Sequence, residues 1–287
     1  MWGFSYWVFP VVSGFTWLGM LIAMLAVWAT SGRPHYASMD PTQKIAYISD
    51  VGAQGLKPLF IAGSVVMTVF LDLSLVAERW LRHRGRLARN LTMLEKVFMF
   101  LSMLGALAGT VGLICLSIMD TLRHPHLHNK FLVVFMVGYV VSAIFICAEY
   151  QRLGIQFREH RVLRVSFWLK LFFIIVEVAL AIAFGVESRK DNFDTAAVLE
   201  WTIAFIFTFY ILSFFIDLIP AVRTKNRVSQ ETVLQMEAND PQAQMHEGHA
   251  RMHSGQFDGQ YEVPQYEVPQ YEVPSYRGDG SRLGQNF

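Results

Sequence analysis

Six long apolar stretches constrain the fold of this chain more than any other feature of its sequence. At a rise of ~1.5 Å per residue, about 20 apolar helical residues cross a hydrocarbon core of ~30 Å. The stretches predicted to do so are Trp7–Thr30, Pro58–Ala77, Val97–Met119, Phe131–Tyr150, Phe167–Val186 and Glu200–Ile219. The predicted fold class is therefore all-α: a polytopic membrane protein built as a six-transmembrane-helix bundle.

The composition agrees with this fold and excludes several functions. The chain is 53% hydrophobic and only 16% charged, and its net charge of +1 argues against a general nucleic-acid binder. Its two cysteines, Cys115 and Cys147, both lie within apolar stretches, which excludes an extracellular disulfide framework. The sequence carries no phosphate-binding loop, dinucleotide fingerprint, nucleophile elbow or zinc-protease motif. We therefore predict a protein without enzymatic activity, with no catalytic residue, cofactor or resident metal.

The distribution of basic residues predicts the orientation. The segments after the second, fourth and sixth stretches carry fourteen Lys or Arg residues, whereas the segments on the opposite side carry seven. Basic residues favour the cytosolic side, so both termini are predicted to be cytosolic. The first stretch is too long for a cleaved signal peptide and lacks a basic leader, so it is expected to stay as an anchor.

The composition changes after the last stretch. We divide the chain into a membrane domain, residues 1–220, and a tail, residues 221–287, which has few aliphatic residues and is predicted to be disordered and cytosolic. Within the tail, Gln-Tyr-Glu-Val-Pro occurs three times over residues 260–274. The repeat is either a multivalent ligand for a cytosolic protein or low-complexity sequence without a dedicated partner.

Arginine-rich segments follow the second and fourth stretches, close to the predicted inner leaflet. In the first of them the arginines alternate with aliphatic residues around Trp80. Basic clusters of this kind attract anionic headgroups, each residue contributing about 1 kcal/mol. The predicted headgroup-binding residues are Arg79, Arg82, Arg84, Arg86, Arg89, Arg158, Arg161 and Arg164.

The two longer outer loops hold the other polar candidates. In the first loop, Asp40-Pro41-Thr42-Gln43 predicts a short helix continuing to about Ile48, and Asp50 either caps a helix or points into a cavity. In the second loop, Pro125 argues against a helix, so the histidines would share one side of an extended strand. This outer-face polar cluster consists of Asp50, Asp120, His124, His126 and His128. Headgroup hydrogen bonding is the favoured role, with zinc binding as a weak alternative.

Two intramembrane features complete the candidates. Glu177 lies near the middle of the fifth stretch, far from other charges in its own helix. It is either functional or engaged in one interhelical hydrogen bond. The other acidic residues within the stretches, Asp72, Glu149 and Asp217, are expected to have structural partners. Gly105, Ala106, Ala108, Gly109 and Gly112 form a small-residue strip, for which packing inside the bundle is favoured over a dimer interface.

These residues together resemble the Frag/DRAM/Sfk family of six-span membrane proteins. The resemblance is carried by Ser5-Tyr6-Trp7, Pro34-His35-Tyr36, the segment Ile48–Ala53 with Pro58-Leu59-Phe60, and Asp120 with His128. It covers about residues 1–220, which includes all six stretches but not the repeats. The arginine-rich segments and long tail make the chain most similar to the fungal Sfk type.

The resemblance implies a protein of the plasma membrane that organises lipids and supports phosphatidylinositol 4-kinase signalling. The implied partners are membrane lipids, mainly anionic phospholipids and also sterol, together with a phosphatidylinositol 4-kinase complex. The family leaves two alternatives open: an autophagy modulator of the vacuole or lysosome, and a factor that remodels GPI-anchor lipids with Asp50, Asp120 and His128. If the protein organises lipids, its function should be lost when Arg82, Arg84, Arg86 and Arg89 lose their charge. If it remodels GPI-anchor lipids, its function should be lost when Asp50 or His128 is substituted.

Overall fold

The structure, a computed structural model, describes residues 6–84, 87, 92–156 and 161–223. Within these residues it contains six helices that are long and apolar enough to cross a membrane, which confirms the predicted all-α, six-span fold. The helices are α1 (Val8–Thr30), α2 (Ile48–Gly52), α3 (Lys57–His83), α4 (Met93–Ile118), α5 (Pro125–Gln156), α6 (Arg161–Arg189) and α7 (Phe193–Arg223). Helix α7 continues three residues into the predicted tail, whereas residues 224–287, with the repeats, lie outside the described part.

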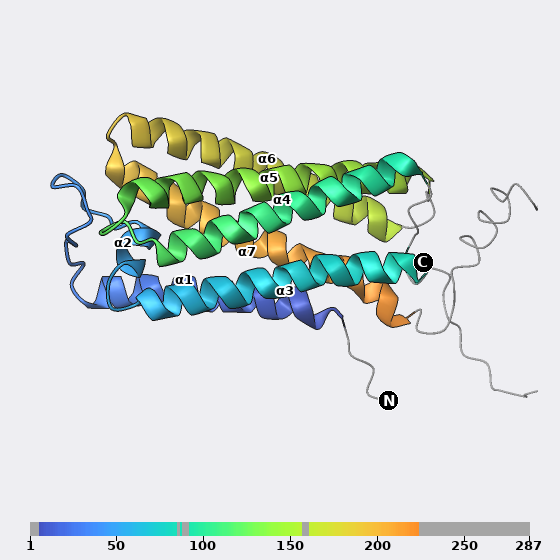
Figure 1. Ribbon diagram of the computed structural model, residues 1–287, viewed down its shortest axis with the longest axis horizontal. Coiled ribbons are helices and arrows are strands. Elements are labelled where there is room, and N and C mark those ends of the chain that lie inside the picture. The colour runs from blue at the N-terminus through green and yellow to red at the C-terminus, as the bar shows by residue number, and fades with distance from the viewer. Residues whose placement is uncertain (1–5, 85–86, 88–91, 157–160, 224–287) are drawn as a thin grey trace, which may run out of the picture. The chain divides into compact units, whose positions relative to one another are not determined.

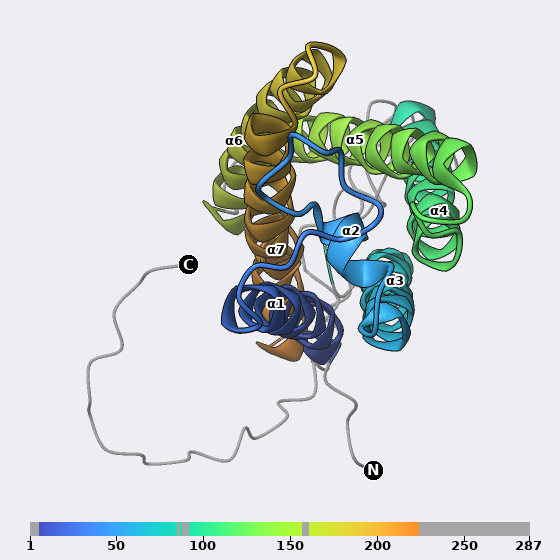
Figure 2. The same ribbon diagram turned by 90° about the vertical axis from the view of Figure 1, so that its left-hand side faces the viewer.

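The six long helices form a ring, in the order α1, α3, α4, α5, α6, α7 and back to α1 (Figures 1 and 2). Figure 2 looks along the ring from the end at which the short helix α2 lies across the middle. We call this the loop end. The opposite end, at which α3 ends and α6 begins, we call the arginine-rich end.

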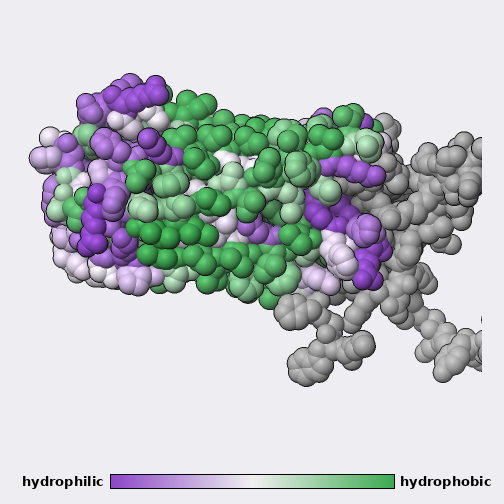
Figure 3. Space-filling model, viewed as in Figure 1, coloured by the Kyte–Doolittle hydropathy of each residue, from purple (hydrophilic) through white to green (hydrophobic). Residues whose placement is uncertain are grey.

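The outside of the ring is apolar between these two ends. Figure 3 shows a broad hydrophobic band on one face, with polar residues at both ends. Large side chains such as Phe15, Phe100, Trp168 and Phe172 are more exposed than buried, with relative accessibilities of 60%, 64%, 62% and 59%. Such exposure is stable when lipid is the solvent, because acyl chains are as apolar as these side chains. The chain is a multi-pass membrane protein.

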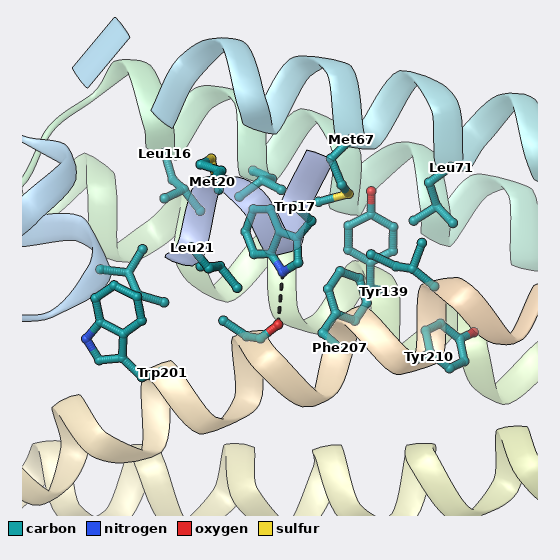
Figure 4. Close-up of a cluster of buried hydrophobic side chains, with 14 of the residues drawn as sticks. Trp17, Met20, Leu21, Met67, Leu71, Leu116, Tyr139, Trp201, Phe207 and Tyr210 are labelled. Atoms are coloured by element: carbon teal, nitrogen blue, oxygen red, sulfur yellow. Dashed lines mark hydrogen bonds between the residues drawn. The ribbon is translucent and has the colours of Figure 1, made fainter. Parts of the chain in front are cut away.

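The inside of the ring combines large side chains with hydrogen bonds between helices. Trp17 of α1 donates its indole N–H to the backbone oxygen of Ala204 in α7 at 2.9 Å, and lies beside Phe207 and Tyr139 (Figure 4). Ser13 of α1 likewise donates to the backbone oxygen of Met67 in α3 at 2.7 Å. Because lipid provides no hydrophobic force between helices, such packing and hydrogen bonds are what hold a membrane bundle together.

Helices α4 and α5 meet along the predicted small-residue strip. A Cβ added at Gly105 would lie 2.8 Å from the backbone nitrogen of Ser142, and one added at Gly112 would lie 2.5 Å from the backbone nitrogen of Phe135. The glycines therefore permit backbone-to-backbone contact inside one chain. The favoured interpretation, internal packing, is confirmed for this face.

Candidate functional site

The first outer loop does not form the helix that its sequence suggests. Residues 41–47 form turns and irregular backbone, and α2 begins only at Ile48. Asp40 does accept a hydrogen bond from the backbone N–H of Thr42, at 2.9 Å, but this closes a local turn and no helix follows. The predicted helix up to Ile48 is wrong because the backbone N–H groups of Lys44, Ile45 and Ile48 donate to carboxylates of α7 and not to helical carbonyl groups.

Three side chains near the start of α7 form hydrogen bonds with this loop. Asp194 accepts the backbone N–H of Ile45 at 2.8 Å, Glu200 accepts that of Ile48 at 2.8 Å, and Trp201 donates to the backbone oxygen of Ala46 at 2.9 Å. These partners lie about 150 residues away in the sequence, so no local pattern predicts them. They fix the loop and α2 across the loop end of the ring (Figure 2).

Asp50 stabilises the start of α2. Its buried carboxylate accepts hydrogen bonds from the Ser38 hydroxyl at 2.7 Å, from the Tyr47 backbone N–H at 3.0 Å and from the Gln43 amide at 3.2 Å. Of the two interpretations of Asp50, helix capping is the one that the structure confirms.

The histidines of the second outer loop do not share one side. Pro125 begins helix α5, so the expected extended strand is wrong: proline is compatible with the first helical turn, where its missing N–H leaves no bond unmade. His128 is buried with its Nδ1 at 2.9 Å from the backbone oxygen of Met119, whereas His124 and His126 are exposed. Among the described residues, no group of three His, Cys, Asp or Glu residues could hold a metal ion.

Asp120 joins the end of α4 to the start of α3. Its carboxylate pairs with Lys57 at 2.5 Å and accepts the backbone N–H of Arg123 at 2.7 Å. Burial by itself raises the pKa of Asp120, but the hydrogen bonds from Lys57 and Arg123 and the positive charges of both residues outweigh it and hold this pKa below its ordinary value. The carboxylate thus has a structural role at the loop end.

The pair of Asp120 and Lys57 predicts a pH dependence of stability. Because folding lowers the pKa of Asp120, its contribution is complete above the ordinary aspartate pKa of about 3.9 and is lost as the pH falls through the folded-state value. We expect Asp120→Asn to lower the free energy of unfolding by about 1.5 kcal/mol near neutral pH and to flatten its fall in acid. Thermal unfolding of the purified protein over a pH series measures both effects. Lys57→Met should behave similarly, and an unchanged pH slope in both variants would contradict the assignment.

A chamber lies in the middle of the ring, between α2 and the arginine-rich end. Its volume is about 110 Å³, and every helix contributes to its lining. Representative lining residues are Trp17, Phe60, Leu116, Tyr139, Ala181 and Phe207, several of which appear in Figure 4. The lining is almost entirely apolar, as expected of a site for a small hydrophobic molecule.

Two carboxyl groups interrupt this apolar lining. Glu200 uses one oxygen to accept the backbone N–H of Ile48. Glu177 projects from the middle of α6, and its buried Oε1 has no hydrogen-bond partner among the residues that the structure describes. The interhelical hydrogen bond that is the structural alternative for Glu177 is therefore not seen at this oxygen among the described residues. The second carboxyl group, Glu200, is not among the predicted site residues, because it lies at the edge of its apolar stretch and does not stand out in the sequence.

Toward the arginine-rich end, the chamber gives way to buried charges that we call the ion network. Three acidic and three basic side chains form one pair within α3 and two pairs between helices, and they are Glu78, Arg79, Arg82, Glu149, Lys170 and Asp217. Arg82 lies 2.6 Å from Glu78, which also accepts the Tyr150 hydroxyl at 2.6 Å, and Arg79 pairs with Glu149. The structural partners expected for Glu149 and Asp217 are present, and Asp72 accepts a hydrogen bond from Thr110 at 2.9 Å.

Lys170 is the member of this network that the predicted distribution of basic residues misplaces. The fourteen basic residues predicted on the cytosolic side include Lys170, but its side chain is 0% exposed inside α6 and lies 2.5 Å from Asp217. Its ammonium group also lies over the ring of Phe214, 4.4 Å from the centroid. An apolar sequence on both sides of a single lysine was the signal that could have placed it inside the membrane.

The ion network also divides the predicted headgroup-binding arginines. Arg79 and Arg82 face into the protein, with side chains only 10% and 5% exposed, so their charges are already paired. Arg84 is exposed and stacks over Trp80 at 4.6 Å, and Arg164 is exposed on α6. Arg86, Arg89 and Arg158 lie outside the described residues, as does the side chain of Arg161.

A ring of six spans, with a loop across one end and paired charges toward the other, defines the class of the chain as a helical multi-pass membrane protein. The chain matches the family described as "Frag1/DRAM/Sfk1/Cwh43P N-terminal domain" over residues 5–221, and it belongs to this family. The match covers all six spans.

Two fungal relatives define its type more closely. Protein sfk1 of Schizosaccharomyces pombe is 34% identical over 223 residues, which cover 77% of this chain and 66% of that protein. Protein SFK1 of Saccharomyces cerevisiae is 26% identical over 275 residues, which cover 72% of this chain and 77% of that protein. The resemblance to the fungal Sfk type is thereby confirmed. No solved structure matches the chain.

Proposed function

We propose that this protein is a non-enzymatic organiser of lipids in the plasma membrane that supports phosphatidylinositol 4-kinase signalling. In this proposal both termini are cytosolic, and the arginine-rich end faces the anionic inner leaflet. Anionic headgroups gather at that end, and a kinase complex works on the lipid held there. The fungal Sfk relatives and the excess of basic residues at this end support the proposal.

The observation that carries the proposal is the exposed pair of Trp80 and Arg84. Trp80 is 47% exposed at the end of α3, and the guanidinium carbon of Arg84 lies 4.6 Å from the centroid of its ring. Tryptophan favours the membrane interface, and a neighbouring arginine there meets phosphate groups. Arg86 and Arg89 follow within five residues, so this position starts a concentrated basic segment.

The arginine variant that tests this proposal should leave Arg82 unchanged. Arg82 belongs to the ion network, so neutralising it would disturb folding as well as charge. The suitable variant changes Arg84, Arg86 and Arg89 to glutamine, which removes about 3 kcal/mol of attraction to an anionic leaflet. In cells that lack the protein, we expect plasma-membrane phosphatidylinositol 4-phosphate to fall, wild type to restore it, and this triple variant at equal surface level not to restore it.

A matched control removes the same charge from the other end of the ring. Arg33, Lys44 and Lys130 are exposed at the loop end, and changing all three to glutamine should leave the rescue intact. Equal rescue by both triple variants, or no fall of the lipid in cells lacking the protein, would overturn the proposal. A vacuolar location, or a loss of GPI-lipid remodelling, would favour the alternative functions instead.

A further inference from the structure

We propose that the central chamber binds one membrane lipid whose polar group is an uncharged hydroxyl. The hydrogen bond of that hydroxyl is accepted by Glu177 Oε1, which has no partner among the residues that the structure describes. The site uses residues remote from Trp80 and Arg84, so it is independent of the proposed function. Its occupant is a lipid because the chamber lies at the depth of the acyl chains and is lined by side chains that favour them.

The dimensions of the chamber fit the apolar body of such a lipid. On α6 the lining runs from Phe173 to Phe184, and on α7 from Glu200 to Tyr210. At ~1.5 Å per residue these segments extend roughly 16 Å along the helices, about half the hydrocarbon thickness. A cavity of about 110 Å³ is also several times larger than the ~10–15 Å³ that one water molecule needs. The chamber is therefore suited to a ring system or part of an acyl chain rather than to a single water molecule.

The lining chemistry selects the polar group of the ligand. Its described lining residues include no Lys, Arg or His, so a phosphate headgroup would meet carboxyl groups without a compensating charge. The Trp17 N–H is already bonded to Ala204, and the Tyr139 hydroxyl lies 3.0 Å from that of Thr110. Glu177 Oε1, by contrast, has no partner in the described part of the chain and requires a donor. A hydroxyl supplies that donor without bringing a charge into hydrocarbon, where an ammonium group would be costly.

The position of α6 gives this lipid a way in from the bilayer. Only 6% of the most apolar window of α6 is buried inside the protein, compared with 33–50% for the other five spans. Figure 2 accordingly shows α6 at the periphery of the protein, where it completes the ring between α5 and α7. Helix α2 covers the loop end, with Ile48 in the lining, and Phe214 and Lys170 follow Tyr210 toward the other end. Entry is thus lateral, past α6.

Photo-crosslinking of the purified full-length protein in lipid nanodiscs tests the proposal. The probes are photoactivatable sterol and ceramide as two sources of a neutral hydroxyl, a fatty amine without hydroxyl groups, and phosphatidylcholine as a phosphate. We expect one hydroxyl probe to label peptides of α6 and α7, and Glu177→Leu to reduce this labelling about fivefold to tenfold, as loss of one hydrogen bond predicts. Glu177→Gln keeps a carbonyl acceptor and should retain most of the labelling.

A matched pair of variants on α6 separates chamber binding from general lipid contact. Ala181 lines the chamber, whereas Ala179 is exposed on the same helix. Ala181→Leu should reduce labelling by the hydroxyl probe severalfold, and Ala179→Leu should not. The proposal is overturned if Glu177→Leu and Ala181→Leu both label like wild type, or if the fatty amine or phosphatidylcholine labels the same peptides as strongly as either hydroxyl probe. Equal loss in Glu177→Gln and Glu177→Leu would also overturn it, because that pattern indicates recognition of a charge.

Discussion

Replacing Asp217 by leucine is expected to lower the free energy of unfolding by about 3–5 kcal/mol. The substitution leaves the Lys170 ammonium group, which is 0% exposed, without its carboxylate partner inside the ring. Unlike a surface lysine, Lys170 has no bulk water beside it, because its side chain is 0% exposed and its Nζ lies 5.1 and 4.4 Å from the ring centroids of Tyr150 and Phe214. Thermal or denaturant unfolding in detergent measures the loss.

The double variant Lys170→Met with Asp217→Leu distinguishes an unpaired charge from damaged packing. Removing both charges should recover most of the lost stability, since a buried ion pair contributes little more than apolar side chains of similar size. The exposed pair of Lys190 and Glu187 provides a comparison: Lys190 is 60% exposed, and Lys190→Met should cost less than 1 kcal/mol. A double variant no more stable than Asp217→Leu would show that the charge is not the cause.

Gly112→Ala is expected to lower the free energy of unfolding by about 1–3 kcal/mol. The added Cβ would lie 2.5 Å from the backbone nitrogen of Phe135 and 2.8 Å from its Cα. Backbone atoms cannot rotate away as a side chain can, so α4 and α5 must separate along their contact. Unfolding of the purified protein measures the change.

Gly154 is the matched control for this prediction. It lies on α5, but a Cβ added there would meet no atom within 4 Å, so Gly154→Ala should be neutral or slightly stabilising. If the glycine face instead joined two copies of the chain, Gly112→Ala would change the oligomeric state and leave the unfolding of the monomer unaffected. That outcome would contradict the internal packing described above.

The site shows where prediction from the sequence works and where it does not. Glu177 was recognised as unusual because an isolated carboxyl group in an apolar stretch is visible without a structure. The sequence does not predict that the Arg82 side chain faces the protein interior. Arg82 and Arg84 stand two residues apart in one basic segment, yet Arg82 is buried and Arg84 is exposed. Likewise a proline inside a loop predicts the absence of a helix, whereas Pro125 stands at the first turn and begins α5.

Hydropathy and charge along the chain are sufficient to predict the number and position of the membrane spans, because the thickness of the bilayer imposes a similar minimum length on every crossing helix. They did not reveal which helices are neighbours, because in lipid each helix is already solvated and its apolar surface has no preferred partner. That choice depends on contacts between distant residues, such as Lys170 with Asp217 and Ile48 with Glu200. The ring, its chamber and the closure of both ends follow from those contacts, and so they emerged only when the helices were packed together.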